Sequence, residues 1–351
     1  MKVFFMWESV SQCKWNQQKN TMSYISKLLL YVTVSILVVA LYMKNRAFTK
    51  NDSAEMVCSV DFIRNVSVCR PVCPRGYFAL PGMVTCHPWL NCGTKIIPLL
   101  TLSVSVVKTI YLARWKQHTV VLSVLSSKEF EDDFMQNIYM LRNLASHSHI
   151  VQLLGYCNNN SILTEYHDLG SALNTNYHLM HTLKSYDTVK VRLNFCISYV
   201  TIIQFLHTSP LGIRVMCDSN TLEKTLSQYL LTSDLKLVIN DLDATPVVNN
   251  ITGRGVHCGN RPLSGSFVAP EQLWPYASEE YDSQKLPLYD EKTDIYKIPD
   301  VCNWFLGNSS DADLVKYKLF NIHKMCKDFN PASRPTAGEI LKAYQEVLRK
   351  I

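Results

Sequence analysis

The stretch Val268-Ala-Pro-Glu-Gln-Leu-Trp-Pro275 determines how the rest of this chain is interpreted. Upstream of it lie two acidic segments, Met216-Cys-Asp218 and Asn240-Asp-Leu-Asp243, and residues 230–241 read as a hairpin that links them. Taken alone, either Asp218 or Asp241 would be an ordinary loop carboxylate. Because both stand in register with the Ala-Pro-Glu of the first stretch, we interpret the three segments as parts of one site.

In order and spacing, the three segments resemble the C-lobe motifs of protein kinases. Kinases carry His-Arg-Asp, Asp-Phe-Gly and Ala-Pro-Glu at these places. Asp218 is therefore the candidate base or orienting residue for an acceptor hydroxyl, and Asp241 is the candidate metal ligand. Gln228 takes the position of the second metal-binding Asn and also offers a carbonyl oxygen.

The C-lobe framework around these motifs is also present. Glu271 is expected to pair with Arg334, and Asp294 is expected to brace the catalytic loop. Cys217 replaces the arginine that normally holds a phosphorylated activation loop. We therefore do not expect switching by phosphorylation of that loop.

The amino-terminal half departs from kinases where ATP phosphates are bound. Ser123 stands in place of the expected lysine, and Asn137 stands in place of its partner glutamate. The phosphate loop runs from Ser103 to Lys108, with serines at 103 and 105 where glycines are usual, and serine tolerates positive φ poorly. Lys108 either reaches from the loop into the phosphates or is a solvated strand lysine, and its position alone does not decide between these readings.

The order of predicted elements favours an α+β, two-lobe protein-kinase-like fold, with a β-rich N-lobe and a helical C-lobe. Apolar spacing predicts a helix in the first half, and mainly helices follow residue 185. We place the kinase-like domain at 94–351, with the N-lobe at about 94–166 and the C-lobe at about 167–351. The predicted strands are 109–115, 119–125, 149–157 and 161–166, and the first helix is 130–144.

Composition excludes some classes of protein. The 351 residues are 47% hydrophobic and 18% charged, so a large core is expected and global disorder is not. The net charge of +6 is spread thinly, with no dense block of Lys and Arg. We therefore expect no nucleic-acid partner.

Residues 28–43 form a charge-free apolar run bracketed by Lys27 and Lys44. Sixteen helical residues span about 24 Å, and snorkelling of the flanking lysines would extend that length. A cleaved signal peptide is the alternative. Against it, the preceding segment of about 27 residues is long for an n-region, and no clear small-x-small site precedes Lys44. We expect a single transmembrane anchor at 28–43 after a cytoplasmic tail at 1–27.

The segment after the apolar run indicates a lumenal location. Cysteines crowd residues 44–93, which we interpret as a disulfide-stapled lumenal stem, because disulfides persist in oxidising compartments. A zinc site is disfavoured, since the paired short spacings are lacking. Sequons for N-glycosylation point to the same compartment. The stem cysteines are Cys58, Cys69, Cys73, Cys86 and Cys92, and the sequons begin at Asn51, Asn65, Asn159, Asn250 and Asn308.

Taken together, these departures from ordinary kinases resemble those of the protein O-mannose kinase family. The similarity covers roughly residues 73–351 and includes a stem pattern, Cys73-Pro…Cys86-x-Pro-Trp-Leu-x-Cys92. The segments that carry it are residues 163–167, Arg214-Val-Met-Cys-Asp-Ser-Asn220, 224–232, Asn240-Asp-Leu-Asp-Ala244, 267–276 and Lys297-Ile-Pro-Asp300. Residues 93–107 match this pattern poorly.

The resemblance implies a single-pass type II glycoprotein of the endoplasmic reticulum membrane with a lumenal catalytic domain. It implies a kinase that uses ATP and Mg²⁺ (or Mn²⁺) to phosphorylate the 6-hydroxyl of O-linked mannose. That mannose lies in a GalNAc-GlcNAc-mannose trisaccharide on α-dystroglycan, and its phosphorylation permits extension of the laminin-binding glycan. Implied roles are Asp218 as base, Asp241 and Gln228 as metal ligands, and Lys108, Ser103, Ser105, Glu165, His167 and Gln228 as nucleotide contacts.

Two other functions stay open at this point. Ser123, Asn137 and the serine-bearing loop are also compatible with a lumenal pseudokinase that acts as a glycan-binding or scaffold module. A receptor-like protein kinase facing the cytosol is the second alternative, and the sequons and stem cysteines argue against it.

Overall fold

The computed structural model describes residues 33, 35–36, 55–145, 147–158, 160–248, 255–259, 261–276 and 278–351. The chain divides into two units, residues 1–55 and residues 56–351. Apart from Thr33, Ser35 and Ile36, which are helical, the expected anchor at 28–43 lies outside the described residues, as does the expected tail at 1–27.

A five-stranded antiparallel sheet with the strand order β5-β6-β7-β9-β8 forms the first part of the second unit. The predicted strands are confirmed to within one residue at each end, except that β8 begins at Leu153 rather than residue 149. Lys116, at φ 53°, makes the tight turn between β6 and β7. The strands are β5 Ile97–Val104, β6 Lys108–Trp115, β7 His118–Leu125, β8 Leu153–Cys157 and β9 Ser161–Glu165.

The helix α2, Glu131–Leu144, follows β7 as the apolar spacing predicts. Three acidic residues occupy its first turn, where they interact favourably with the positive end of the helix dipole. Phe134, Ile138 and Leu141 are buried on one face and join the main hydrophobic core. Asn137 of the same helix is also buried, so its polar side chain lies inside the protein.

The segment expected as a stem packs against the sheet through two short hairpins. Cys58–Cys69 staples β1 to β2, Cys73–Cys86 precedes β4, and Cys92–Cys157 ties the segment to the end of β8. The Leu90 amide donates to the Leu154 carbonyl at 2.8 Å. Gly155 is required beside it, because a Cβ there would lie 2.3 Å from the Leu90 oxygen. These strands are β1 Met56–Asp61, β2 Val66–Pro71, β3 Tyr77–Phe78 and β4 His87–Pro88.

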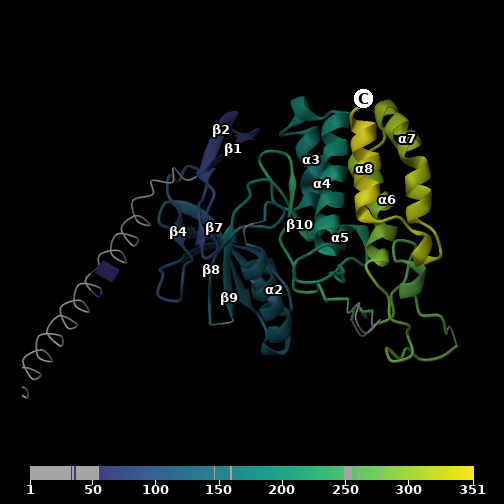
Figure 1. Ribbon diagram of the computed structural model, residues 1–351, viewed down its shortest axis with the longest axis horizontal. Coiled ribbons are helices and arrows are strands. Elements are labelled where there is room, and N and C mark those ends of the chain that lie inside the picture. Colours follow the sequence, from purple (N-terminus) through teal and green to yellow (C-terminus); the bar gives the residue numbers. More distant parts are fainter. Residues whose placement is uncertain are drawn as a thin grey trace, which may run out of the picture. The chain divides into compact units, whose positions relative to one another are not determined.

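Helices dominate the chain after residue 185, as predicted, and a short helix at Thr175–Met180 precedes them. Side-chain caps begin several of them. Thr188 caps α4, Ser309 caps α7, and Thr336 with Glu339 forms a capping box on α8. Figure 1 shows these helices together with the strand-rich part of the unit. Their bounds, with those of the intervening β10–β11 hairpin, are α3 Thr175–Met180, α4 Val189–His207, α5 Leu222–Ser227, β10 Tyr229–Leu231, β11 Leu237–Ile239, α6 Lys292–Leu306, α7 Ser310–Cys326 and α8 Ala337–Leu348.

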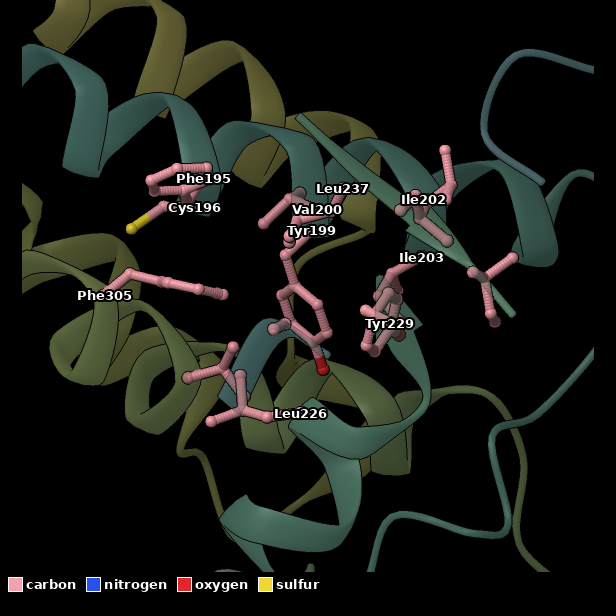
Figure 2. Packing of buried hydrophobic residues seen from close by; sticks show 14 of the residues in the cluster. Phe195, Cys196, Tyr199, Val200, Ile202, Ile203, Leu226, Tyr229, Leu237 and Phe305 are labelled. Atoms are coloured by element: carbon pink, nitrogen blue, oxygen red, sulfur yellow. The ribbon is translucent and has the colours of Figure 1, made fainter. Parts of the chain in front are cut away.

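The central helix of this part is α4, whose buried side chains contact several neighbouring elements. Tyr199 stacks edge-on against Tyr229 of β10, and Phe195 lies against Phe305 of α6. Figure 2 shows these rings in the core, with Leu226 and Leu237 close by. Packing of this kind holds the β10–β11 hairpin, which carries Asp241 at its end, against the helices.

Among the described residues, α4 is the one helix that is long and apolar enough to cross a membrane. Part of its apolar window, 44%, is buried inside the protein, as in the core helix of a folded domain. It is therefore weak evidence of membrane anchoring. The unit as a whole is a mixed α and β structure in which a β-rich sheet region precedes the helices.

Candidate active site

The β10–β11 hairpin places Asp241 beside Gln228. Tyr229 pairs with Ile239 in the hairpin register, and the Asn240 amide donates to the Gln228 carbonyl at 2.9 Å. Asp241 therefore leaves the hairpin opposite Gln228, the residue between α5 and β10. The hairpin is joined to the sheet region, since the Val151 amide donates to the Ile239 carbonyl at 2.9 Å.

Lys108 extends from the first residue of β6 to the two aspartates of the Asp-Leu-Asp segment. Its Nζ lies 2.6 Å from Asp241 Oδ1 and 3.1 Å from Asp243 Oδ2. The Lys108 side chain is 8% exposed, so the reading of Lys108 as a solvated strand lysine is wrong. The Leu242 amide, between the aspartates, donates to Asn137 Oδ1 at 3.2 Å, which ties α2 to the same segment.

The pKa values of the two carboxylates in this cluster are shifted in opposite directions. Burial alone would raise the pKa of Asp241, but Lys108, the hydrogen bond with Asp243 and the charge of Lys224 hold that pKa below its usual value. Burial and the neighbouring Asp241 raise the pKa of Asp243 to about 7, although Lys108 opposes this. Near neutral pH the two carboxylates thus carry between one and two negative charges beside the ammonium of Lys108.

Asp218 lies on the loop before α5, where its side chain is partly open to solvent. Its Oδ2 is 2.7 Å from Lys224 Nζ, and Lys224 also lowers the pKa of Asp241. Lys224 is therefore electrostatically close to both aspartates. Lys224 and Asp243 are functional candidates that the sequence patterns above do not predict. Two sequence features could have indicated these residues: Lys224 is a lysine six residues after the candidate base, and Asp243 is an aspartate in place of the glycine of Asp-Phe-Gly.

The loop that carries Asp218 is held by groups in the protein interior. Asp294 Oδ2 accepts from the Met216 amide and from His207 Nε2, both at 3.1 Å, so the predicted brace is confirmed. The predicted pairing of Glu271 with Arg334 is also confirmed, with two bonds of 2.6 and 2.8 Å. A bidentate pair of this kind fixes the orientation of both side chains.

A disulfide between Cys217 and Cys258 joins the loop that carries Asp218 to the segment that follows Asp243. In the sequence Cys217 is predicted only as a replacement for arginine, and no pattern there indicates Cys258 as its partner. Both cysteines lie in a small apolar cluster with Val215, Val256 and Tyr289. Residues 249–254 of the same segment lie outside the described residues. The residue next to Asp218 is therefore covalently fixed.

The serine-bearing loop is a hairpin turn between β5 and β6. Ser105 Oγ donates to the Lys108 carbonyl at 2.9 Å and accepts from the Lys108 amide at 3.1 Å. Ser103 pairs with Ile110 after a register shift in β5. No residue from 103 to 107 has a positive φ, so serine is tolerated without the strain that its replacement of glycine suggested. Direct nucleotide contacts of Ser103 and Ser105 stay predictions.

Glu165 and His167, predicted to contact nucleotide, lie at the end of β9 with other partners. Glu165 Oε2 is 2.7 Å from Arg70 Nη1, and Glu165 Oε1 accepts from the Gln152 amide at 3.0 Å. His167 Nε2 lies 3.4 Å from Glu165 Oε1. Burial alone would raise the pKa of Glu165, but Arg70 and His167 hold it far below its usual range. The Glu165 carboxylate is thus occupied by the β1–β2 hairpin, and nucleotide contact by either residue stays a prediction.

The residues around Asp241 suit a divalent cation bound together with phosphates. Gln228 Oε1 is buried without a hydrogen-bond partner, and the two aspartates supply further oxygen atoms. The described part of the chain contains no group of three or more His, Cys, Asp or Glu that would hold a metal alone. Mg²⁺ at phosphoryl-transfer sites typically uses one or two carboxylates, substrate phosphates and water. This donor set fits that pattern.

Comparison with known proteins identifies relatives that match about four-fifths of the chain. No family model matches the chain. The protein O-mannose kinase of Homo sapiens is 48% identical over 282 residues, which is 79% of this chain and 80% of that protein. The same kinase from Gallus gallus is 49% identical over 284 residues, and that from Xenopus laevis is 44% identical over 283 residues, with the same coverage. Because identity of this degree extends over about four-fifths of both chains, the chain belongs to the protein O-mannose kinase family.

Proposed function

We propose that this protein is an active kinase that transfers the γ-phosphoryl group of ATP to the 6-hydroxyl of O-linked mannose. The acceptor in this proposal is a GalNAc-GlcNAc-mannose trisaccharide on α-dystroglycan, and the product permits extension of the laminin-binding glycan. The observation that carries the proposal is the contact of Lys108 with Asp241 and Asp243, in a member of this family. This contact supports the proposal because it brings an ammonium group next to Asp241, although Ser123 replaces the usual lysine.

The chain's own residues divide the work of the reaction. Asp218 orients the mannose 6-hydroxyl and accepts its proton while the bond from that oxygen to phosphorus forms and the bond to ADP breaks. Lys108 and Lys224 supply positive charge around the transferred group. Asp241 and Gln228 would hold Mg²⁺ or Mn²⁺, with Asp243 beside them. Such an ion supplies charge neutralisation of the phosphate oxygens when bound.

We propose a two-lobe kinase architecture for residues 94–351, with the nucleotide between the sheet region and the helices. Support comes from Lys108 on β6 meeting Asp241 after β11, two residues 133 positions apart in the chain. Residues 44–93 would be a stem that continues into the fold. We further propose a single-pass type II protein of the endoplasmic reticulum, anchored by residues 28–43 with the catalytic domain lumenal. The disulfides and sequons support this location.

The pseudokinase alternative was motivated by Ser123, Asn137 and the serine-bearing loop. Lys108 meets the need for charge, Asn137 holds the Leu242 amide, and the loop closes without positive φ. These observations favour the active kinase.

Separate substitution of the two aspartates tests the proposal. Asp241→Ala should abolish metal-dependent nucleotide binding, measured by calorimetry. Asp218→Ala should keep that binding and lower phosphate transfer by about 10²–10⁴-fold, the contribution of a general base. Near-normal turnover by the Asp218 variant on the glycan would show that the reaction does not use this loop.

A further inference from the structure

Lys297 is a buried lysine for which the proposed reaction has no use. It lies on α6, one turn after Asp294, and its side chain is 2% exposed. Taking an ammonium out of water costs several kcal/mol, and that cost must be met by local partners. Consistent with its location, burial lowers the pKa of Lys297, against the attraction of Asp294 and Glu271.

The partners of Lys297 lie in the catalytic loop. Lys297 Nζ donates to Ser219 Oγ at 2.6 Å, and Ser219 Oγ donates in turn to the Met216 carbonyl. Asp294 Oδ2 accepts from the Met216 amide, while Asp294 Oδ1 lies 3.9 Å from Lys297 Nζ. Met216, Ser219, Asp294 and Lys297 thus form a closed set of polar contacts, called here the Lys297 ring.

The Lys297 ring holds the backbone on both sides of Asp218. Met216 and Ser219 are buried, whereas the Asp218 side chain is 37% exposed and points out of the ring toward Lys224. Asp294 binds only the Met216 side of this turn. Within the turn, the Ser219 amide donates to the Cys217 carbonyl at 2.7 Å. Lys297 ties the Ser219 side chain to α6, because Ser219 Oγ receives a hydrogen bond from that ammonium.

We propose that Lys297 is a positioning residue that sets the direction of the Asp218 carboxylate by fixing Ser219. This inference rests on the proposed role of Asp218 as the base. A buried ion of this kind is rarely a net gain in stability over a well-packed apolar residue, but it restricts the conformations that its partners adopt. Displacement of a catalytic group by about 1 Å can cost about 10²-fold in rate. The ring should therefore act on kcat and leave nucleotide affinity unchanged.

The test compares Ser219→Ala, Lys297→Met and the double variant in the full-length protein with an O-mannosyl trisaccharide and ATP. Ser219→Ala should lower kcat about 10-fold and Lys297→Met about 10–100-fold, with the Kd for nucleotide within about twofold of the parent. The double variant should be no slower than Lys297→Met, since both changes break the same contact. Thr175→Val, which removes a buried hydroxyl of α3, and Lys327→Met, which removes the lysine paired with Asp300, are matched controls that should keep kcat.

Hydrogen exchange gives a readout that does not depend on turnover. Amides from Met216 to Ser219 should exchange faster in Ser219→Ala while the amides of α6 keep their protection. If the parent itself lacks turnover on the glycan but this local loosening is seen, the proposed reaction fails and the ring stands. If folded Ser219→Ala and Lys297→Met keep both kcat and protection, or if their effects on kcat multiply, the positioning role is overturned.

Discussion

Lys108 reaches the two aspartates because β6 begins at a turn that Ser105 closes with its own side chain. The lysine is thereby directed inward from the start of the strand. Ser123, one strand further on, pairs with Ile110 of β6 and Ile162 of β9 in the ladder. The lysine that kinases carry on that strand is replaced by Ser123 here, and the Lys108 ammonium lies instead at the start of the neighbouring strand.

Replacement of Lys108 should show how far the reaction depends on this charge. Lys108→Ala should lower kcat/KM by about 10²–10³-fold, as the loss of one charged donor at a reacting group does. Lys108→Arg should restore part of the activity, because a planar guanidinium does not match the position of a compact ammonium. Ser123→Lys alone should bring little gain. Steady-state kinetics with ATP and the glycan measure these effects.

Lys116 provides the control for this series, since it is an exposed lysine on the same sheet that lies over the Trp115 ring. Lys116→Ala should keep kcat/KM. A parent enzyme whose turnover survives Lys108→Ala would disprove the role assigned to Lys108.

The Cys217–Cys258 disulfide joins two segments, the loop that carries Asp218 and the segment after Asp243. It spans 41 residues and occupies the place where kinases hold a phosphorylated loop through arginine. A covalent bond there links the two segments without any phosphate group. Cys217→Ala with Cys258→Ala should therefore lower kcat about 10–100-fold through misplacement of Asp218. The free energy of unfolding should fall by about 2–5 kcal/mol.

The Cys58–Cys69 disulfide is the matched control, because it closes the β1–β2 hairpin. Its double alanine variant should keep kcat. Kinetics at a temperature where all variants are folded separate the two effects. Unchanged kcat after loss of Cys217–Cys258 would restrict that bond to a role in stability.

The contact between the β1–β2 hairpin and β9 should make stability sensitive to acid. Glu165 has a pKa lowered in the folded state relative to the ordinary value of 4.5. A carboxyl group whose pKa is lower in the folded state stabilises the fold at pH values above its unfolded pKa. That stabilisation is lost as the pH falls toward the folded pKa. Glu165→Gln should destabilise the protein by about 1–3 kcal/mol at neutral pH, because Arg70 and the Gln152 amide lose a charged acceptor.

Urea unfolding of the parent and of Glu165→Gln at a series of pH values measures this difference. The gap in free energy of unfolding should shrink from about pH 5 downward. A gap that is constant with pH would contradict the ionised state assigned to Glu165.

Elements with local periodicity were predictable, and contacts between distant segments were not. The strands β6 and β7 and the helix α2 follow from apolar spacing within about fifteen residues. The motifs also located Asp218 and Asp241. The partner of Cys217 was not deducible, because sequence does not determine disulfide connectivity. The contact of Lys108 with Asp241 joins residues 133 positions apart, and the pairing of Arg70 with Glu165 joins residues 95 positions apart. Both depend on the packing of distant segments, which apolar spacing does not reveal.

At the scale of the whole molecule, the proposed lumenal location has a direct test in microsomes. Asn65 lies at φ 52° in the turn after β1, and Asn308 follows the end of α6, and both are exposed. The asparagines of the other three sequons, Asn51, Asn159 and Asn250, lie outside the described residues. Synthesis with microsomes should give protease-protected protein with a glycosidase-sensitive mass shift, reduced by Asn65→Gln and by Asn308→Gln. Protein digested from the cytosolic side without such a shift would contradict this topology.

Transfer of labelled γ-phosphate from ATP tests the central claim most directly. Full-length protein is given a synthetic GalNAc-GlcNAc-mannose trisaccharide beside a hydroxyl-bearing peptide without sugar, and Asp218→Ala serves as the inactive control. We predict label on the 6-hydroxyl of mannose, little label on the peptide, and loss of transfer in the variant. Glycan binding without turnover in the parent protein would contradict the account and favour a pseudokinase, and label on the peptide alone would contradict the acceptor.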